Sequence, residues 1–213
     1  MLNKLILSKL SNPIIEKSFA IIDETVGRHN LDTAQYHIAR RIIHTTADFE
    51  YLNLLQCSPN VIDIAIKSLM AKTTIITDVS MVKEGIRNMV AKTYDNEIVV
   101  AVKQAQKADG DKTRTETGLL KCCPQHPHGI YVIGNAPTAL IALCDQIKAQ
   151  KIKPALVIGV PVGFVSVIES KQALAKLDVP QITIDGRKGG SPAAAAILNA
   201  LLILAVENKD VVD

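Results

Sequence analysis

Five short apolar runs, each followed by a helical pattern, constrain the fold of this 213-residue chain most strongly. They are rich in Val and Ile and do not alternate with polar residues: TTIITDV (73–79), EIVVAV (97–102), IYVIGN (130–135), PALVIGV (154–160) and PQITID (180–185). Such runs are typical of strands buried on both faces of a parallel sheet. Alternation of strand and helix requires crossovers that place helices on both sides of the sheet. The sequence therefore predicts an α/β fold, a three-layer α/β/α sandwich with a mainly parallel five-stranded sheet.

The first seventy residues carry helix-start signals, so N-terminal helices are expected ahead of the sheet. Asn12-Pro13 is an N-cap followed by proline, and Asp32-Thr33 and Ser58-Pro59 open two further segments. We expect helices over about 12–28, 33–47, 60–71, 79–91, 137–149, 165–177 and 191–206. The polar residues 103–128 are predicted to be a long excursion, either a lid or a partner-binding element. No linker or repeat divides the chain, so residues 1–213 are expected to form a single domain.

The composition argues against a nucleic-acid partner. Trp is absent and aromatic residues make up 3% of the chain, which leaves few rings on which the bases of single strands stack. The formal net charge is +3 and no run of Lys or Arg occurs. An anionic ligand would have to be held by a few placed groups rather than by the field of the whole surface.

Membrane and disulfide signals are also missing. A spanning helix needs about 20 apolar residues, whereas the start MLNKLILSKL is interrupted by Lys4 and Lys9. The segment AAAAILNALLILAV carries Asn199 and follows a helix-start signal, which favours a buried helix. The four cysteines form no CxxC motif, and no signal peptide precedes them. We therefore expect no membrane association and a reduced, cytoplasmic protein.

The loops that follow the predicted strands are the first candidates for a ligand site, because open parallel sheets bind ligands at the carboxyl ends of their strands. Glycine lets backbone approach a ligand, and helix N-termini offer free N–H groups to anions. The candidate binding residues in and beside these loops are Asp78, Met81, Asn135, Ala136, Pro137, Thr138, Pro161, Gly163, Phe164, Arg187, Gly189, Gly190 and Ser191. The alternative is that they are ordinary tight turns. Neither GKS/GKT nor GxGxxG occurs, which argues against a nucleotide site.

His44 is the candidate general acid. Arg40 lies four residues before it and Asp48 four residues after, so all three share one helical face. Arg40 favours the neutral imidazole and Asp48 the imidazolium, and such opposed neighbours suit a group that exchanges protons. The alternative is a surface histidine in a ladder of charges. Arg114 and Arg187 are candidate carboxylate clamps, because guanidinium binds carboxylates bidentately; each alone is more often a surface arginine.

A local group of Cys and His is the only candidate for a metal. Cys122, Cys123, His126 and His128 are metal-ligand types, but their spacing lacks the paired arrangement of a structural zinc site. We expect no metal and no other cofactor, and keep a metal protein as an alternative.

Six long segments resemble precorrin-8X methylmutase, also called precorrin isomerase. They are EKSFAIID (16–23), RRIIHTTADFE (40–50), IITDVSMV (75–82), IGNAPTAL (133–140), IGVPVGFVSVIESKQAL (158–174) and DGRKGGSPAAAAILNAL (185–201). They run in order over nearly the whole chain. The strings IGNAPTAL and PVGFVSVIESK are far more specific than a glycine motif.

The resemblance implies a parallel sheet between helical layers, a homodimer, and an isomerase of cobalamin biosynthesis. The family moves a methyl group from C-11 to C-12 of precorrin-8 to give hydrogenobyrinate, or of cobalt-precorrin-8 to give cobyrinate, without a redox cofactor. Its catalytic histidine falls on His44, a substrate-contacting serine on Ser18, and an arginine near the macrocycle on Arg114. The alternatives are a tetrapyrrole carrier without turnover and a nucleotide-dependent oxidoreductase.

A methyl shift around a conjugated ring needs a polarised π-system and no nucleophile. We hypothesise that His44, as imidazolium, donates a hydrogen bond or proton to a ring nitrogen near the migrating methyl. The substrate is a broad disc with carboxylates around its rim. Its site is expected to combine apolar walls with a rim of N–H donors and arginines. The walls would come from Met81, Val160, Pro161, Val162 and Phe164, and the rim from the helix-start loops 135–138 and 189–191 with Arg114 and Arg187. Arg40 is a further candidate for substrate binding.

Overall fold

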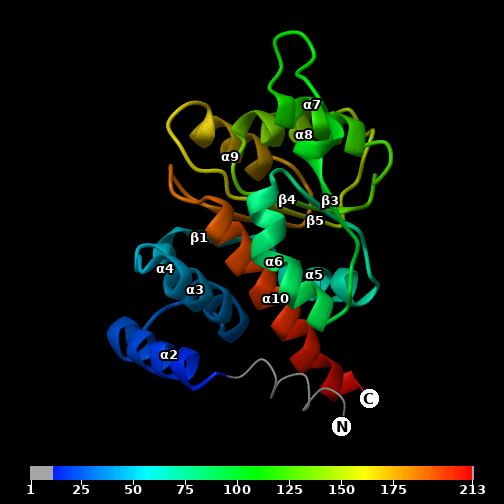
Figure 1. Cartoon of the computed structure of the whole chain (residues 1–213). Helices are drawn as coiled ribbons and strands as arrows, with labels where there is room; N and C mark the ends of the chain where they lie inside the picture. The colour runs from blue at the N-terminus through cyan, green and yellow to red at the C-terminus, as the bar shows by residue number, and fades with distance from the viewer. Residues whose placement is uncertain (1–11, 213) are drawn as a thin grey trace.

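A single sheet forms the middle layer of the computed structural model, which describes residues 12–212 and the side chains of residues 12–207 (Figure 1). Within that part, six strands follow the order β1-β6-β5-β4-β2-β3. They are β1 Leu55–Cys57, β2 Ile75–Thr77, β3 Ile98–Val100, β4 Ile130–Ile133, β5 Leu156–Gly159 and β6 Gln181–Ile184. The five predicted strands are confirmed, and neighbours among them pair in parallel.

The predicted strand count was one too low. β1 adds an antiparallel edge strand on β6, with Gln56 opposite Thr183. The segment LQC gave no strand signal, because three residues are too few to show a burial period, and a helix precedes them directly. Its pairing is fixed by the tertiary structure and not by local pattern.

Helices cover both faces of the sheet, which confirms the three-layer sandwich (Figure 1). One layer holds α3, α5, α6 and α10, and the other holds α7, α8 and α9. The helices are α2 Pro13–Val26, α3 Thr33–Thr46, α4 Tyr51–Leu54, α5 Val61–Met70, α6 Ser80–Lys92, η1 Ala101–Gln104, α7 Arg114–Cys122, α8 Pro137–Lys148, α9 Val167–Ala175 and α10 Ser191–Val212. No described helix is long and apolar enough to cross a membrane. The segment MLNKLILSKL lies outside the described residues.

The excursion predicted over 103–128 is partly wrong, because α7 occupies its second half. Thr113 caps this helix: its hydroxyl accepts from the Glu116 N–H at 3.2 Å, and Glu116 accepts from the Thr113 N–H at 3.4 Å. The sequence signal for this helix start is the T-x-x-E pattern of a capping box at residues 113–116. α7 then buries Leu119 and Cys122 against α8.

α3 carries the predicted site residues Arg40 and His44. A capping box between Asp32 and Gln35 begins the helix, and Ala47 in the left-handed conformation ends it. Ile38, Ala39, Ile42 and Ile43 are buried in the core cluster that α10 also fills. The apolar stripe fixes the rotation of the helix, so the polar residues 40, 41, 44 and 45 lie on its outer side.

Candidate functional site

The loops at the carboxyl edge of the sheet contact one another. The N–H of Gly190 donates to the carbonyl of Val160 at 2.8 Å, and the N–H of Gly163 donates to the carbonyl of Arg187 at 3.3 Å. Backbone N–H groups of the β4–α8 loop donate to Asp78, which follows β2. The predicted grouping of these loops at one edge is therefore present.

Asp78 organises this edge. Its carboxylate is fully buried and accepts from the N–H groups of Val79 (2.9 Å), Gly134 (3.1 Å), Asn135 (2.7 Å) and Ala136 (2.8 Å). Burial raises the pKa of Asp78, and the four N–H donors oppose that effect by favouring the charged form. Because both oxygens are occupied and covered, Asp78 builds the loop instead of offering a surface to a ligand.

The β6–α10 loop, residues 185–190, is held by two buried side chains. The Lys171 ammonium donates to the carbonyls of Gly186 (2.9 Å) and Lys188 (2.6 Å). Burial lowers the pKa of Lys171 to about 8, and the charge of Asp185 opposes that shift. The Tyr51 hydroxyl donates to the carbonyl of Gly189 at 3.2 Å and accepts from its N–H at 3.1 Å.

Gly189 is required by packing. Its φ is +148°, and a Cβ there would come within 2.3 Å of the carbonyl oxygen of Val160. Gly189 therefore allows the β6–α10 loop to pack against the backbone at Val160. This packing requires glycine at this position independently of any ligand.

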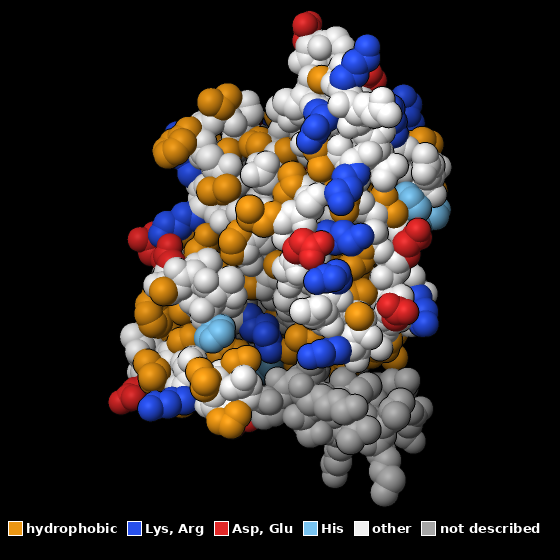
Figure 2. Space-filling view, in the orientation of Figure 1, with side chains coloured by type: hydrophobic (Ala, Val, Ile, Leu, Met, Phe, Trp, Pro, Cys, Tyr) orange, Lys and Arg blue, Asp and Glu red, His pale blue; other side chains and the backbone are white. Residues whose placement is uncertain are grey.

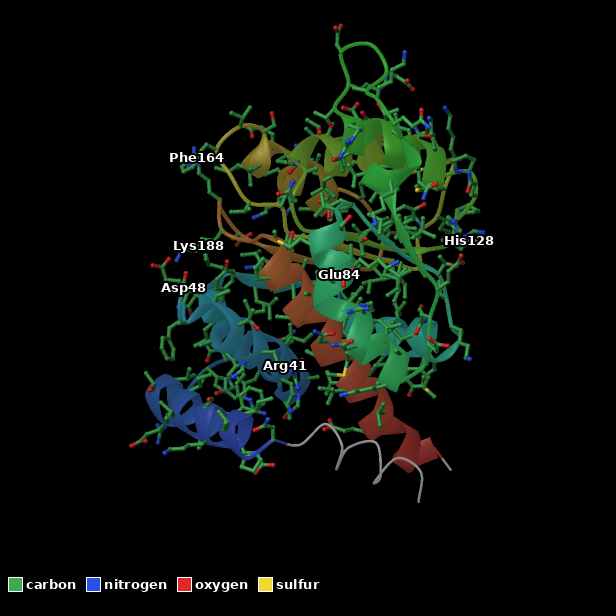
Figure 3. All side chains as sticks on the ribbon, viewed as in Figure 1. Arg41, Asp48, Glu84, His128, Phe164 and Lys188 are labelled. Carbon is green, nitrogen blue, oxygen red and sulfur yellow. The ribbon has the colours of Figure 1, made fainter. Side chains whose placement is uncertain are left out.

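The end of α3 is joined to the same loop. Lys188 forms ion pairs with Asp48 and with Glu50, the latter at 2.9 Å, and Figure 3 shows Lys188 and Asp48 adjacent. The hydrogen bond from Lys188 lowers the pKa of Asp48. The prediction that Asp48 shares the helical face of His44 is wrong, because α3 ends at Thr46. Among the described residues no ion pair joins the two, and Asp48 instead links two loops through Lys188.

Phe19 of α2 gathers the basic residues of α3 around one ring. Its ring centroid lies 5.4 Å from that of His44, edge to face, and 4.3 Å from the guanidinium carbon of Arg40. The guanidinium carbon of Arg41 lies 5.7 Å from the same centroid. Arg40 is also paired with Asp23 at 2.8 Å, so the protein already neutralises this predicted ligand contact. The hydroxyl of predicted Ser18, one residue before Phe19, donates to the carbonyl of Ile14.

A cavity of about 350 Å³ lies between α3, α6 and α10. Met81 and Ser191 were predicted site residues, and both line it. The full lining is Arg41, Thr45, Met81, Gly85, Ser191, Pro192, Ala195, Ala196 and Asn199. Figure 3 places Arg41 between α3 and α10, and in Figure 2 the surface is hollowed there, with blue and pale-blue side chains side by side. His44 is exposed and adjoins Thr45, and it shares the Phe19 ring with Arg41. His44 itself is not among the lining residues; it lies on α3 next to the Arg41 and Thr45 positions that are.

Arg41 is the residue that sequence reasoning missed. It stands next to Arg40 in the same motif, and only the rotation of α3 and the position of α2 decide which arginine meets Asp23 and which meets the cavity. The signal available was the i, i+4 relation of Arg41 to Thr45, which puts both on one face.

Several predicted residues lie elsewhere. Arg114 is exposed at the start of α7, in the opposite helical layer from His44. The Thr138 hydroxyl is bonded to that of Thr113 at 2.9 Å. Asn135 and Arg187 are exposed, whereas Ala136, Pro161 and Gly190 are buried and Pro137 and Gly163 are half-buried.

Of the predicted apolar walls, Met81 lines the cavity between α3, α6 and α10, whereas Val160, Val162 and Phe164 do not. Phe164 and Val162 point outward, with 88% and 45% of their surface exposed. Val160 is buried in the core instead.

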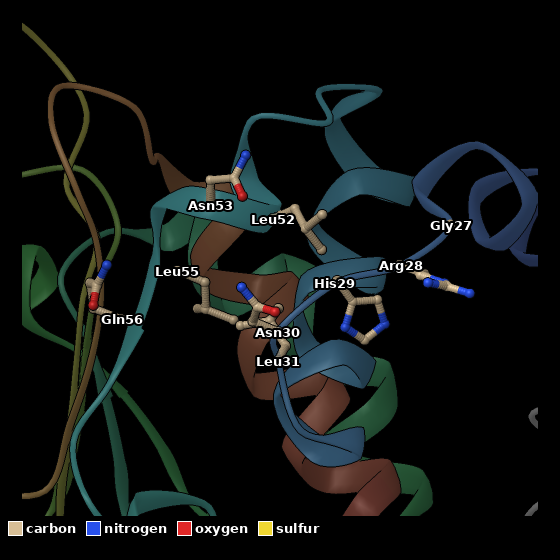
Figure 4. A pocket seen from close by; sticks show the side chains of 9 residues that line it. All are labelled: Gly27, Arg28, His29, Asn30, Leu31, Leu52, Asn53, Leu55 and Gln56. Atoms are coloured by element: carbon tan, nitrogen blue, oxygen red, sulfur yellow. The ribbon is translucent and has the colours of Figure 1, made fainter.

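A wider cavity of about 810 Å³ lies between the α2–α3 loop and the α4–β1 segment (Figure 4). Its lining is Gly27, Arg28, His29, Asn30, Leu31, Leu52, Asn53, Leu55 and Gln56. It contains none of the predicted site residues. The wider cavity also has a basic group and an imidazole, Arg28 and His29. We take the smaller cavity as the candidate site, because predicted Met81 and Ser191 line it and the first turns of α6 and α10 meet there.

The Cys and His group does not assemble a metal centre. Cys122 and Cys123 are buried, and all four cysteines of the chain are free thiols. His128 lies with Nδ1 3.0 Å from the Lys153 carbonyl oxygen. Over residues 12–207, no three His, Cys, Asp or Glu side chains gather as metal ligands.

Fold and site together define a class: a three-layer α/β sandwich with a cavity lined by an arginine and an exposed histidine nearby on the same helix. Comparison with known proteins adds the family. The family model for precorrin-8X methylmutase matches residues 13–204. A cobalt-precorrin-8 methylmutase from Synechocystis is 53% identical over 210 residues, covering 92% of this chain and 97% of the relative. One from Leptospira interrogans is 39% identical, covering 93% and 96%.

The structural comparison agrees. The crystal structure of a precorrin-8X methylmutase from Thermus thermophilus superposes with a TM-score of 0.83 at 36% identity, covering 92% of this chain and 96% of that one. The chain belongs to the precorrin-8X methylmutase family. Members of this family are isomerases of cobalamin biosynthesis.

Proposed function

We propose that this chain moves a methyl group from C-11 to C-12 of cobalt-precorrin-8 and gives cobyrinate, with His44 as the acid. The proposal is supported by the family match and by an exposed imidazole on α3, next in sequence to Thr45, which lines the cavity together with Arg41. The cobalt form is proposed because the relatives from Synechocystis and Leptospira are cobalt-precorrin-8 methylmutases.

The proposed step needs little from the protein beyond orientation and one proton donor. The bond from the methyl carbon to C-11 breaks as its bond to C-12 forms, so atoms and electrons balance within the substrate. His44 donates a hydrogen bond or proton to a ring nitrogen and polarises the conjugated system. General acid help of this kind is worth ~10²–10⁴-fold in rate. The remaining acceleration comes from holding the macrocycle in the geometry that the migrated product prefers.

The two alternatives are disfavoured for different reasons. A tetrapyrrole carrier would need no acid at the ligand, whereas His44 is exposed on α3 with no carboxylate partner among the described residues. A nucleotide-dependent oxidoreductase would need a phosphate-binding loop. Here the backbone N–H groups of the β4–α8 loop already donate to the Asp78 carboxylate, so they are not free to donate to a phosphate.

Absorbance spectra test the proposal directly. Purified protein is incubated with cobalt-precorrin-8 and, separately, with metal-free precorrin-8, and the product spectrum is followed. We expect conversion of the cobalt form with the larger kcat/KM. Conversion of the metal-free form alone would overturn the assignment of substrate. A stable complex of either form without conversion would establish a carrier instead.

We further propose that the chain acts as a cytoplasmic homodimer. Apolar side chains stand exposed at the carboxyl edge, among them Phe164, Val165 and Met81, with 88%, 83% and 67% of their surface accessible. A macrocycle is also larger than the 350 Å³ cavity, so a second surface is needed to cover it. Sedimentation velocity is expected to give twice the chain mass; a monomer at micromolar concentration contradicts the proposal.

A further inference from the structure

The cavity between α3, α6 and α10 is too small for a tetrapyrrole ring. At about 350 Å³ it lies near the lower end of the range of ligand pockets, ~300–1,000 Å³. Its walls are short side chains: Gly85 from α6, and Pro192, Ala195 and Ala196 from α10. A slot of this kind admits a chain of methylenes with a polar end, such as the acetate or propionate groups at the rim of a corrin. The ring itself would remain outside, at the mouth of the cavity.

Arg41 supplies the charge for such a group. Its Nε is buried and has no hydrogen-bond partner among the described residues. The negative charge of Glu207 on α10 favours the charged form of the Arg41 guanidinium. Among the described side chains, however, Glu207 and Arg41 form no ion pair. Burial lowers the pKa of the Arg41 guanidinium, and the neighbouring charge of Arg40 adds to that effect. An anion in the cavity offsets both penalties, because a desolvated charge is stabilised by a hydrogen-bonded counter-charge.

Arg40 differs from Arg41 in having an ion-pair partner, although its Nε, too, is buried without a hydrogen-bond partner among the described residues. It is one residue away on the same helix, and Asp23 already accepts from it at 2.8 Å while it covers Phe19. Among the described side chains, Arg40 therefore has an ion pair with Asp23, whereas Arg41 has none and lines the cavity. Asn199 of α10 is fixed there as well, because its amide N–H donates to the carbonyl of Gly85 at 3.0 Å. Its buried oxygen has no partner among the described residues, and a water bound beside a carboxylate can fill it.

We propose that this cavity is a subsite for one rim carboxylate of the macrocycle, bound by Arg41, and that it sets the orientation of the ring over His44. The inference rests on the proposed function, since it takes a corrin as the ligand. The inference adds to the proposed function a residue, Arg41, that binds one rim carboxylate. It also adds a cavity that distinguishes this carboxylate of the macrocycle from the others.

Binding of cobyrinate and of its singly amidated derivatives tests the subsite. The variants are Arg41→Met, Arg41→Gln and, as a control, Arg87→Met. Arg87 lies on α6 in the same helical layer, and it is exposed and paired with Glu84. Arg87→Met therefore removes one positive charge, as Arg41→Met does, but at a position outside the cavity. Circular dichroism checks that each variant folds.

We expect wild type to bind cobyrinate and to lose ~10–100-fold in affinity for one monoamide, the one whose amide falls at Arg41. Both Arg41 variants should bind cobyrinate ~10–100-fold more weakly and should no longer distinguish that monoamide. Arg87→Met should bind as wild type does.

Two outcomes overturn the subsite while the proposed function stands: undiminished affinity in the Arg41 variants, or discrimination among monoamides that survives in them. If Arg41→Met fails to fold, Arg41→Gln and the binding of the monoamides by wild type still test the subsite. A wild type that binds every monoamide equally has no such subsite. Failure of wild type to bind or convert any macrocycle would instead contradict the proposed function itself.

Discussion

Replacing His44 with alanine is expected to lower kcat for methyl migration by ~10²–10⁴-fold while the protein still folds and binds the macrocycle. The imidazole is exposed and makes no hydrogen bond or ion pair with another described residue. Its one ring contact, edge-on to Phe19, is worth only about 1 kcal/mol. Removing it therefore leaves the core intact and withdraws the proton donor. Single-turnover absorbance with saturating cobalt-precorrin-8 measures the effect on the chemical step.

A matched control separates this role from a general loss of histidine. His128 is exposed just before β4, and its one side-chain hydrogen bond to a described residue is with the Lys153 carbonyl, so His128→Ala should turn over at the wild-type rate. Wild-type turnover by His44→Ala would remove His44 from the chemistry. Loss of macrocycle binding, with chemistry unimpaired in the bound fraction, would make it a binding residue only.

Asp78→Ala is expected to have the largest effect on stability, lowering the free energy of unfolding by about 4 kcal/mol. The substitution leaves four buried N–H groups without an acceptor, from Val79, Gly134, Asn135 and Ala136. Each unsatisfied buried donor costs about 1–3 kcal/mol, and partial relaxation and water entry reduce the sum. Asp78→Asn keeps one acceptor oxygen and should lose roughly half as much.

Urea unfolding followed by circular dichroism checks this prediction. Asp145→Ala is the control, because that carboxylate is exposed and paired only with Lys148 at 3.7 Å; a loss within about 0.5 kcal/mol is expected there. A loss below about 1 kcal/mol in Asp78→Ala would mean that water replaces the carboxylate freely, and that this aspartate does not hold the β2 and β4 loops together.

The parts of the fold that the sequence predicted are those with a strong local signal. The five parallel strands were found because both of their faces are buried, which leaves uninterrupted apolar runs such as Ile130–Ile133. α10 was found because it is apolar nearly all round and sits between α3 and α6. β1 could not be found, because three residues acquire a strand conformation only by pairing with β6. α7 had a capping signal at Thr113 that was not used.

The site was predicted in part, for a similar reason. The rule that ligands bind at the carboxyl ends of strands led to Met81 and Ser191, which do line the cavity. It also selected Asp78, whose oxygens turn inward to the loops they hold, because sequence does not tell a carboxylate that binds backbone from one that faces a ligand. The separate fates of Arg40 and Arg41 depend on Asp23 and Phe19 of α2, which are distant in sequence. Pairings of that kind follow from packing and not from motif.

The decisive measurement is a crystal structure of the protein with cobyrinate bound. We expect the ring at the carboxyl edge of the sheet, with one of its nitrogens within hydrogen-bond distance of the His44 imidazole and one rim carboxylate against Arg41. A ring seated elsewhere, for example in the wider cavity beside His29 and Asn53, with His44 facing only solvent, would contradict the site and the chemistry assigned to it.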